Sequence, residues 1–218
     1  MIIAIDGPSG SGKSTLGRML ARELNLLYLD TGSMYRAVAL VTIEAQLDPT
    51  DSEAVVNLAS RADIDLEGDP DSLKVLVNGR DVTDEIRTEK VTEMSSIVSS
   101  IPGVRRAMVA RQRALGQRGA VLNGRDIGTV VFPDADIKFF LTAAPGERAE
   151  RRFKEDRMTN SDVSLEETMA EMVERDRRDS TRADSPLKIA DDAIVIDSSG
   201  LSIDQTFARM MEYVHGHH

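Results

Sequence analysis

The feature that most constrains this chain is the segment at residues 7–14, whose letters GPSGSGKS fit the pattern G-x-x-x-x-G-K-[ST] at every specified position. The apolar residues 2–5 lead directly into it, and a helical pattern follows it, with apolar positions at Leu16, Met19, Leu20 and Leu24. Glycines allow successive backbone N–H groups to turn toward an anion at a helix N-terminus, where the partial positive charge favours phosphate. A glycine-rich turn that binds no ligand would not need a strand directly before it and a helix directly after it. The segment therefore predicts a loop that binds the phosphates of a nucleoside triphosphate.

Lys13 and Ser14 add side-chain chemistry to this loop. The Lys13 ammonium is placed to reach the β- and γ-phosphates, and the Ser14 hydroxyl is a ligand for Mg²⁺. Asp30 follows the second apolar run and is placed to orient the ion through a water molecule. The residues expected to bind the triphosphate along the loop are Gly7, Pro8, Ser9, Gly10, Ser11, Gly12, Lys13, Ser14 and Thr15.

Composition excludes several classes of protein. Of the 218 residues, 41% are hydrophobic and 29% are charged, which predicts a globular protein with a substantial core. The chain has no cysteine, and this excludes disulfides, thiolate zinc sites and a cysteine nucleophile. A net charge of −10 argues against a nucleic-acid partner. No signal peptide or bilayer-length apolar run is recognisable, so we expect a cytoplasmic protein without membrane contact.

Short apolar runs alternate with helical patterns along most of the chain. The runs are residues 2–5, 26–29, 120–122, 137–141 and 193–196. This alternation predicts an α/β fold with a five-stranded parallel sheet covered by helices on both faces. One helix is expected over about residues 33–45. The last helix is announced by the capping box Ser202-x-x-Gln205, and its apolar face is expected to be core rather than a cofactor site, with Ile203, Phe207, Met210 and Val214.

Residues 63–83 break this alternation. Apolar residues recur there at every second position, namely Ile64 and Leu66, then Leu73, Val75 and Val77. The Asn78-Gly79 dipeptide that follows favours a tight hairpin turn. Because so short a unit does not fold alone, we expect a small antiparallel insert packed on the main fold.

Two polar clusters follow strands of the predicted sheet. Residues 30–36 (DTGSMYR) come after the second apolar run, and residues 123–129 (NGRDIGT) come after the third. Ligands gather at the carboxyl ends of parallel strands, so both clusters should lie beside the phosphate-binding loop, where Arg36 is suited to bind a phosphate with two hydrogen bonds. Simpler interpretations are a helix start capped by Thr31 or Ser33, and a surface salt bridge in the second cluster.

A third polar cluster lies on a helix that the capping box Ser164-x-x-Glu167 predicts. Arg175, Asp179 and Arg182 stand at i, i+4 and i+7 and share one face of this helix. Such a pattern is often only a solvated, charged helix face. Here arginine outnumbers the acidic residues locally, although the whole chain is acidic, so we expect an anion between this face and Lys13.

Taken together, the motifs resemble those of the bacterial cytidylate kinases, nucleoside monophosphate kinases related to adenylate kinase that have a P-loop NTPase fold. The resemblance runs from Ile3 to the last helix. It is most specific in the motifs at residues 123–135 and 174–187 and in the enlarged insert before residue 90, whereas the phosphate-binding loop alone does not identify a family. The motifs are GPSGSGKST (7–15), DTGSMYR (30–36), VNGRDVT (77–83), DEIRTEKV (84–91), NGRDIGTVVFPDA (123–135) and ERDRRDSTRADSPL (174–187).

This resemblance implies ATP with Mg²⁺ as the phosphoryl donor, CMP or dCMP as the acceptor, and a monomeric enzyme. It also implies one P-loop kinase domain over residues 1–218. Within that domain we expect a monophosphate-binding region at 30–100, which contains the insert, and a short lid at 147–160. Since the acceptor's phosphate oxygen is already ionised, transfer needs no general base, in keeping with the lack of a recognisable catalytic triad.

Individual residues acquire expected roles from the same resemblance. The acceptor phosphate would be held by Thr31, Arg36, Arg125 and Arg182. The ribose would contact Arg175 and Asp179, and the cytosine would contact Ser96, Arg105 and Asp126. Tyr35 is expected in the acceptor site as well, and the lid would contact ATP through Arg148 and Arg152. The expected catalytic residues are Lys13, Arg125, Arg152 and Arg182.

Two other functions remain open from the residues alone. A kinase acting on another small acceptor, such as shikimate or a different nucleoside monophosphate, would share the loop. It would not need the insert, nor an acid such as Asp126 at the base. A regulatory GTP-binding switch would need an Asn-Lys-x-Asp motif for guanine, and the chain has none.

Overall fold

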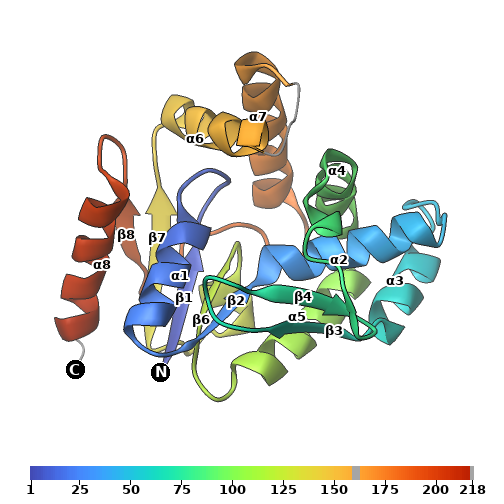
Figure 1. Ribbon diagram of the computed structural model, residues 1–218, viewed down its shortest axis with the longest axis horizontal. Helices are drawn as coiled ribbons and strands as arrows, with labels where there is room; N and C mark the ends of the chain where they lie inside the picture. Colours follow the sequence, from blue (N-terminus) through green and yellow to red (C-terminus); the bar gives the residue numbers. More distant parts are fainter. Residues whose placement is uncertain (159–162, 217–218) are drawn as a thin grey trace.

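The five predicted apolar runs form one parallel sheet (Figure 1). The computed structural model describes residues 1–158 and 163–216. Within them the strand order is β2-β6-β1-β7-β8, so the strand that leads into the glycine-rich loop is central. The strands are β1 (Ile2–Asp6), β2 (Leu27–Asp30), β6 (Ala120–Gly124), β7 (Ile137–Thr142) and β8 (Ile194–Asp197). The predicted fold class is confirmed.

Helices cover both faces of this sheet. Along β1, Ile3 and Ile5 share a core with α1 and α8, whereas Ala4 belongs to the core that α2 and α5 cover. Successive side chains of a strand point to opposite faces, so one buried strand serves both cores. The helices are α1 (Lys13–Glu23), α2 (Thr31–Glu44), α3 (Ser52–Arg61), α4 (Glu89–Val98), α5 (Pro102–Gly116), α6 (Pro145–Met158), α7 (Leu165–Thr181) and α8 (Ile203–Gly216), with the short segments η1 (Glu85–Arg87) and η2 (Ile127–Val131).

The predicted antiparallel insert is present as a separate three-stranded sheet. It consists of β3 (Ile64–Glu67), β4 (Lys74–Val77) and β5 (Arg80–Asp81). Asn78 and Gly79 connect β4 to β5 with φ angles of 50° and 77°, the left-handed conformation that tight hairpins favour. The inward-facing residues of β3 and β4 belong to the same core cluster as α2, so the insert packs on the main fold.

Helix α2 begins two residues earlier than predicted. It starts at Thr31, and neither Thr31 nor Ser33 caps it, so that simpler interpretation of the segment is wrong. The Thr31 hydroxyl instead donates to the Asn123 carbonyl oxygen at 2.8 Å, and the Ser33 hydroxyl donates to Asp30 at 2.9 Å. These hydroxyls connect the ends of β2 and β6 with each other and with α2, which places the polar cluster at the edge of the sheet.

Helices α6 and α7 lie above the carboxyl end of the sheet (Figure 1). Both predicted capping boxes are present, at Ser164 before α7 and at Ser202 before α8. The predicted lid, 147–160, falls on α6, and its residues 159 and 160 lie outside the described part of the chain. In the described residues, the structure has no helix with the length and apolar character needed to cross a membrane.

Asp6 ends β1 and is buried. Its carboxylate accepts hydrogen bonds from the backbone N–H groups of Ile127 at 2.9 Å and Gly128 at 2.8 Å, at the start of η2. Burial raises the pKa of Asp6 to about 6, although the two N–H donors oppose the rise. Asp6 therefore connects the strand before the phosphate-binding loop with the segment that carries Arg125 and Asp126.

We expect Asp6 to make the free energy of unfolding fall as the pH rises from about 4 to about 6. Its folded pKa of about 6 exceeds its ordinary value of 3.8, so in this range the folded state binds the extra proton. The loss amounts to about 3 kcal/mol at most, because one pKa unit corresponds to about 1.4 kcal/mol. Urea unfolding at several pH values, compared with Asp6→Asn, isolates this contribution because the other carboxyl groups titrate in both proteins. Parallel curves for the two proteins would contradict the assignment.

Candidate active site

The phosphate-binding loop joins β1 to α1. Gly7 passes so close to β7 that a Cβ atom there would lie 2.1 Å from the Leu141 carbonyl oxygen, and its φ of 148° also disfavours a side chain. Lys13 is the first residue of α1, and its Nζ donates to the Pro8 carbonyl oxygen at 2.6 Å and to Ser11 Oγ at 3.4 Å. The ammonium group therefore lies inside the loop, at the helix N-terminus that favours an anion.

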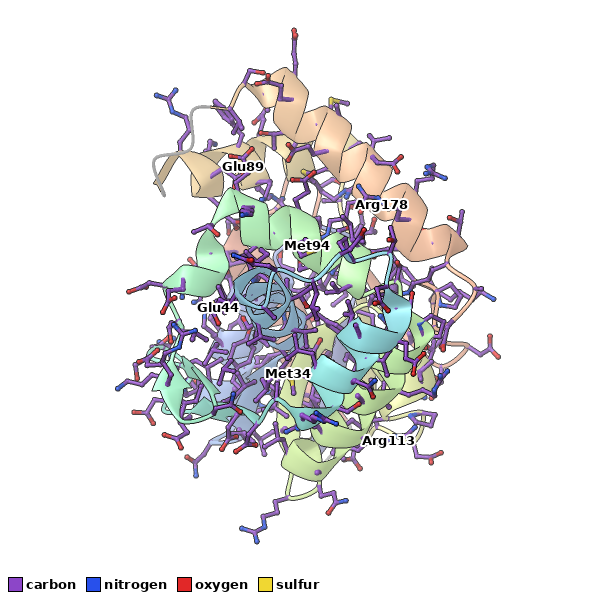
Figure 2. All side chains as sticks on the ribbon, turned by 90° about the vertical axis from the view of Figure 1, so that its right-hand side faces the viewer. Met34, Glu44, Glu89, Met94, Arg113 and Arg178 are labelled. Atoms are coloured by element: carbon purple, nitrogen blue, oxygen red, sulfur yellow. The ribbon has the colours of Figure 1, made fainter. Side chains whose placement is uncertain are left out.

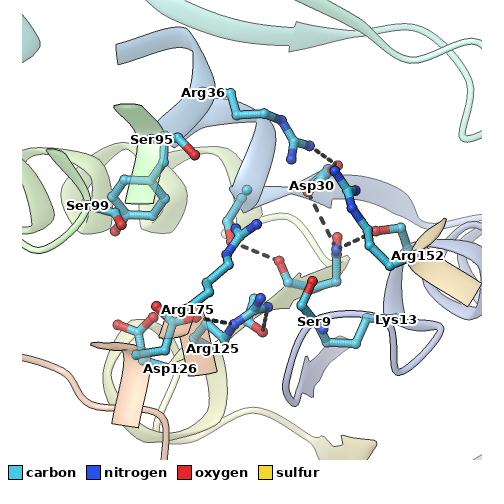
Figure 3. A pocket seen from close by; sticks show the side chains of 18 of the residues that line it. Ser9, Lys13, Asp30, Arg36, Ser95, Ser99, Arg125, Asp126, Arg152 and Arg175 are labelled. Carbon is cyan, nitrogen blue, oxygen red and sulfur yellow. Dashed lines mark hydrogen bonds and ion pairs between the residues drawn. The ribbon is translucent and has the colours of Figure 1, made fainter. Parts of the chain in front are cut away.

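Most of the predicted site residues line one pocket at the carboxyl ends of β1, β2 and β6 (Figure 3). They are Ser9, Gly10, Gly12, Lys13, Ser14, Thr15, Asp30, Thr31, Tyr35, Arg36, Arg105, Arg125, Asp126, Arg152, Arg175, Asp179 and Arg182. Gly32, Ser95, Ser99, Asn123, Gly124 and Glu155 complete the lining. The clusters that follow different strands therefore meet, as the parallel sheet predicts.

Carboxylates hold several arginines of the pocket. The pairs are Arg36–Asp30 at 3.5 Å, Arg125–Asp179 at 2.8 Å and Arg152–Asp156 at 2.8 Å. Some buried donors of the pocket's arginines have no hydrogen-bond partner within the described residues, namely Arg36 Nε and Arg105 Nε. Buried donors are rarely left unpaired, so these atoms indicate a polar ligand in the pocket.

Positive charge accumulates around Lys13. Burial lowers the pKa of Lys13 well below its ordinary value, and Arg125 and Arg175 lower it further. Burial and Arg125 likewise lower the pKa of Arg175 to about 10. Burial by itself would raise the pKa of Asp179, but Arg125, Arg175 and Arg182 outweigh it and hold that pKa low. An anion bound between these cations would relieve their mutual repulsion.

Asp126 and Arg105 form a buried pair in the part of the pocket beside the first turn of α5. Arg105 Nη2 donates to Asp126 Oδ2 at 2.5 Å, and the two side chains are only 2% and 5% exposed. The Arg105 guanidinium also lies 5.2 Å from the centroid of the Tyr35 ring. Burial would lower the pKa of Arg105, but Tyr35 and Asp126 outweigh it and raise that pKa. The pair therefore presents a charged acceptor and a charged donor side by side.

Ser96 is not among the residues that line this pocket. Its hydroxyl accepts a hydrogen bond from Arg178 Nη1 of α7 at 3.0 Å, on the side of the molecule that Figure 2 views. Ser95 and Ser99 line the pocket instead, and sequence reasoning missed both. Their spacing of i and i+4 indicates a shared helix face, but adjacent serines give no local signal of which one faces a ligand. The contact between Ser96 and cytosine stays a prediction.

Arg148 also lies outside the pocket lining. Its guanidinium donates to the carbonyl oxygens of Ser9 at 2.9 Å and Ala143 at 3.2 Å, and to the Asp176 carboxylate at 2.6 Å. All three partners belong to the protein. The predicted contact between Arg148 and ATP stays a prediction.

A second cavity lies on the other side of the phosphate-binding loop. Its lining is Gly10, Ser11, Gly12, Thr15, Leu16, Arg151, Glu155, Ser198, Leu201, Ile203 and Thr206. Gly10, Gly12, Thr15 and Glu155 also line the first pocket, so the two cavities meet at the loop. Gly7 and Pro8 line neither.

The prediction that Ile203 is a core residue is wrong. Its side chain is 39% exposed because the first turn of α8 faces the second cavity, whereas Met210 and Val214 further along the helix are buried against the sheet. An apolar residue at the start of an amphipathic helix gives no sequence signal that separates a cavity wall from a core position.

Ser14, Asp30 and Asn123 fit the predicted Mg²⁺ site. Asn123 Nδ2 lies 3.2 Å from Ser14 Oγ and 3.5 Å from Asp30 Oδ1, so the three side chains meet at the edge of the sheet. The buried Asn123 Oδ1 has no hydrogen-bond partner within the described residues. Mg²⁺ prefers oxygen ligands and keeps several waters, and such a water would donate to this atom.

Comparisons with known proteins identify the family of the chain. A family model described as cytidylate kinase matches residues 3–216. The cytidylate kinase of Desulforamulus reducens is 51% identical over 214 residues, which cover 97% of this chain and 96% of the relative. The cytidylate kinase of Solibacter usitatus is 50% identical over 218 residues, which cover 98% of this chain and 92% of the relative.

Among solved structures, an uncharacterized protein from Eubacterium ventriosum has a similar fold. The TM-score is 0.55 at 13% identity, and the match covers 99% of this chain and 98% of the other. At this identity the likeness concerns the fold alone. The family model spans nearly the whole chain and the relatives share about half of its residues, so the chain belongs to the cytidylate kinase family.

Proposed function

We propose that this protein transfers the γ-phosphoryl group of ATP to CMP or dCMP, giving ADP and CDP or dCDP. The observation that carries the proposal is the pair of cavities that meet at the phosphate-binding loop, one of which contains the buried Asp126–Arg105 pair. Family membership and the names of the relatives support the same acceptor.

ATP fits the loop and the second cavity. The loop amides and Lys13 would hold the triphosphate at the N-terminus of α1, and Arg152 would approach it from the lid. The adenine would lie in the second cavity, where Leu16, Leu201 and Ile203 supply an apolar wall. Such a wall with a few polar groups at its rim is typical of small-molecule sites.

CMP fits the first pocket. Cytosine offers an amino donor at position 4 and an acceptor at N3, while a carboxylate only accepts and a guanidinium only donates. Asp126 would face position 4 and Arg105 would face N3, with Ser96 and Tyr35 nearby. The acceptor phosphate would be held by Thr31, Arg36, Arg125 and Arg182, and the ribose by Arg175 and Asp179.

The chemistry then consists of positioning and charge neutralisation. The ionised phosphate oxygen of CMP attacks the γ-phosphorus in line, so no residue needs to remove a proton. Lys13, Arg125, Arg152 and Arg182 would stabilise the charge on the moving group, and closure of α6 would exclude water that otherwise hydrolyses ATP. Mg²⁺, held by Ser14 and through water by Asp30 and Asn123, would neutralise charge on the β- and γ-phosphates.

We also propose that the enzyme acts as a monomer, because side chains of one chain line both cavities. We propose a cytoplasmic site of action as well, in keeping with membership of the cytidylate kinase family. ADP production from ATP, measured with CMP, dCMP, UMP, AMP and shikimate offered separately, tests the proposed function. We expect rapid turnover with CMP or dCMP only. Faster turnover with AMP or shikimate would overturn the assignment of the acceptor.

Lys13→Met is expected to leave the fold intact and to lower turnover by a factor on the order of 10²–10³ or more, because it removes a charge directed at the moving phosphoryl group. Steady-state kinetics at saturating ATP and CMP measure the loss. The matched control is Lys188→Met, which removes an exposed lysine outside both cavities. Near-normal turnover in Lys13→Met would refute the role of the loop.

Arg152→Ala is expected to lower phosphoryl transfer and to raise ATP hydrolysis relative to transfer, because closure over the donor would be incomplete. The two rates are measured as CDP and inorganic phosphate from the same reaction. Arg157→Ala serves as the control, since Arg157 is exposed on the same helix and lies over the Phe153 ring. If Arg152→Ala behaves like this control, Arg152 belongs to a solvated helix face.

Asp126→Asn is expected to lower kcat/KM for CMP far more than for UMP, and so to narrow the preference between them. Uracil presents an acceptor at position 4, which repels a carboxylate but accepts a hydrogen bond from an amide. Sites that leave buried polar groups unpaired reject an analogue by roughly 10⁴-fold, which bounds the effect. If the ratio of the two kcat/KM values does not change, Asp126 only holds Arg105 in place.

A further inference from the structure

Arg148 and Asp176 connect helices α6 and α7 with the phosphate-binding loop, three segments that are far apart in the sequence. Arg148 belongs to α6 and Asp176 to α7, and Arg148 Nη1 donates to Asp176 Oδ2 at 2.6 Å. The same nitrogen donates to the carbonyl oxygen of Ser9, in the phosphate-binding loop, at 2.9 Å. The second carboxylate oxygen of Asp176 accepts from the Ser9 N–H at 3.4 Å. We call this set of contacts between Ser9, Arg148 and Asp176 the clasp.

Backbone packing supports the clasp. Gly10 lies so close to α6 that a Cβ atom there would be 2.5 Å from the Arg148 carbonyl oxygen, and its φ of 71° also favours glycine. The side chains of Arg148 and Asp176 are 11% and 20% exposed. Because they are largely shielded from water, each would leave a poorly solvated charge behind if the other were removed.

The clasp lies behind the residues that face the nucleotides. Asp176 follows Arg175 directly and precedes Asp179 by one helical turn, and both of these line the first pocket. Neither Arg148 nor Asp176 lines either cavity. A displacement of α7 from the loop would therefore move Arg175 and Asp179 away from Lys13.

We propose that Arg148 and Asp176 are positioning residues, which hold α7 and its part of the acceptor site at a fixed distance from the phosphate-binding loop. This role does not depend on the predicted contact between Arg148 and ATP, because neither side chain lines a cavity. The inference rests on the proposed function, because that distance governs transfer between a donor on the loop and an acceptor on α7. Misplacement of reacting groups by about 1 Å costs on the order of 10²-fold in rate, so the clasp affects kcat more than KM.

Asp176→Asn and Arg148→Met test the proposal kinetically. Each is expected to lower kcat by a factor of roughly 10–100, while KM for ATP and for CMP changes by less than about threefold. The double variant should be no slower than the slower single variant, because the two side chains act through one contact. The matched control is Arg177→Met on the same helix, which removes an exposed ion pair with Glu174 and should keep kcat.

Three kinetic outcomes would refute the proposed positioning role of the clasp. One is unchanged kcat in both single variants. Another is a double variant whose loss is the product of the single losses, which would mean that the residues act independently. The third is a large rise in KM for ATP in Arg148→Met alone, which would make Arg148 a direct contact to ATP.

A distance measurement tests the clasp without relying on activity. The chain has no cysteine, so spin labels can be attached to Glu23→Cys at the end of α1 and to Ser180→Cys, an exposed position of α7. Asp176→Asn should broaden or shift the distance distribution between the labels, and Arg177→Met should not. An unchanged distribution in Asp176→Asn would refute the clasp. A changed distribution together with no turnover of CMP by the parent protein would refute the proposed function and leave the clasp standing.

Discussion

Repulsion between like charges around Lys13 is the constraint on which the site depends. Seven cationic side chains line one pocket in a chain whose net charge is −10. Lys13, Arg36 and Arg105 lie on helices that pack into the two cores, so their positions are fixed by that packing, whereas Arg152 and Arg175 lie on α6 and α7. Carboxylates such as Asp30, Asp126 and Asp179 compensate part of the charge. The positive charge that remains uncompensated creates an electrostatic field in the pocket before a ligand binds. Such preorganised electrostatics are the main source of rate enhancement in phosphoryl transfer.

The parallel sheet makes this concentration of charge feasible. Three neighbouring strands end at the same edge, so residues distant in the sequence reach the pocket without long loops. Asp6 stabilises this arrangement, because its carboxylate binds the backbone N–H groups at the start of η2. This contact fixes the position of Arg125 and Asp126, which directly precede η2. Its raised pKa reflects the cost of burying a charge without an adjacent cation as hydrogen-bonding partner, and the two N–H groups offset that cost only in part.

The predictable part of the site is local in sequence. The phosphate-binding loop and the clusters after β2 and β6 were recognisable because glycines and charges stand directly at strand ends. The expected role of Arg105 follows only from the family resemblance, since a single arginine on an amphipathic helix gives no local indication of a binding site. Successive residues of an α-helix are rotated by about 100°, so Ser95 and Ser96 point in different directions. Which of the two faces the pocket is decided by the tertiary packing of α4. Likewise, Ile203 has the residue type and spacing of a core position, and only the path of the chain after β8 makes it a cavity wall.

The two cavities share four residues, and this has a consequence for inhibition. Gly10, Gly12, Thr15 and Glu155 line both cavities, so the two cavities adjoin each other at the phosphate-binding loop. A molecule that carries adenosine at one end and cytidine at the other, joined by a chain of phosphates, would occupy both compartments at once. It would lose translational freedom once instead of twice, and the linked ends would raise each other's effective concentration. The adjoining cavities thus favour a bisubstrate ligand over a pair of separate analogues.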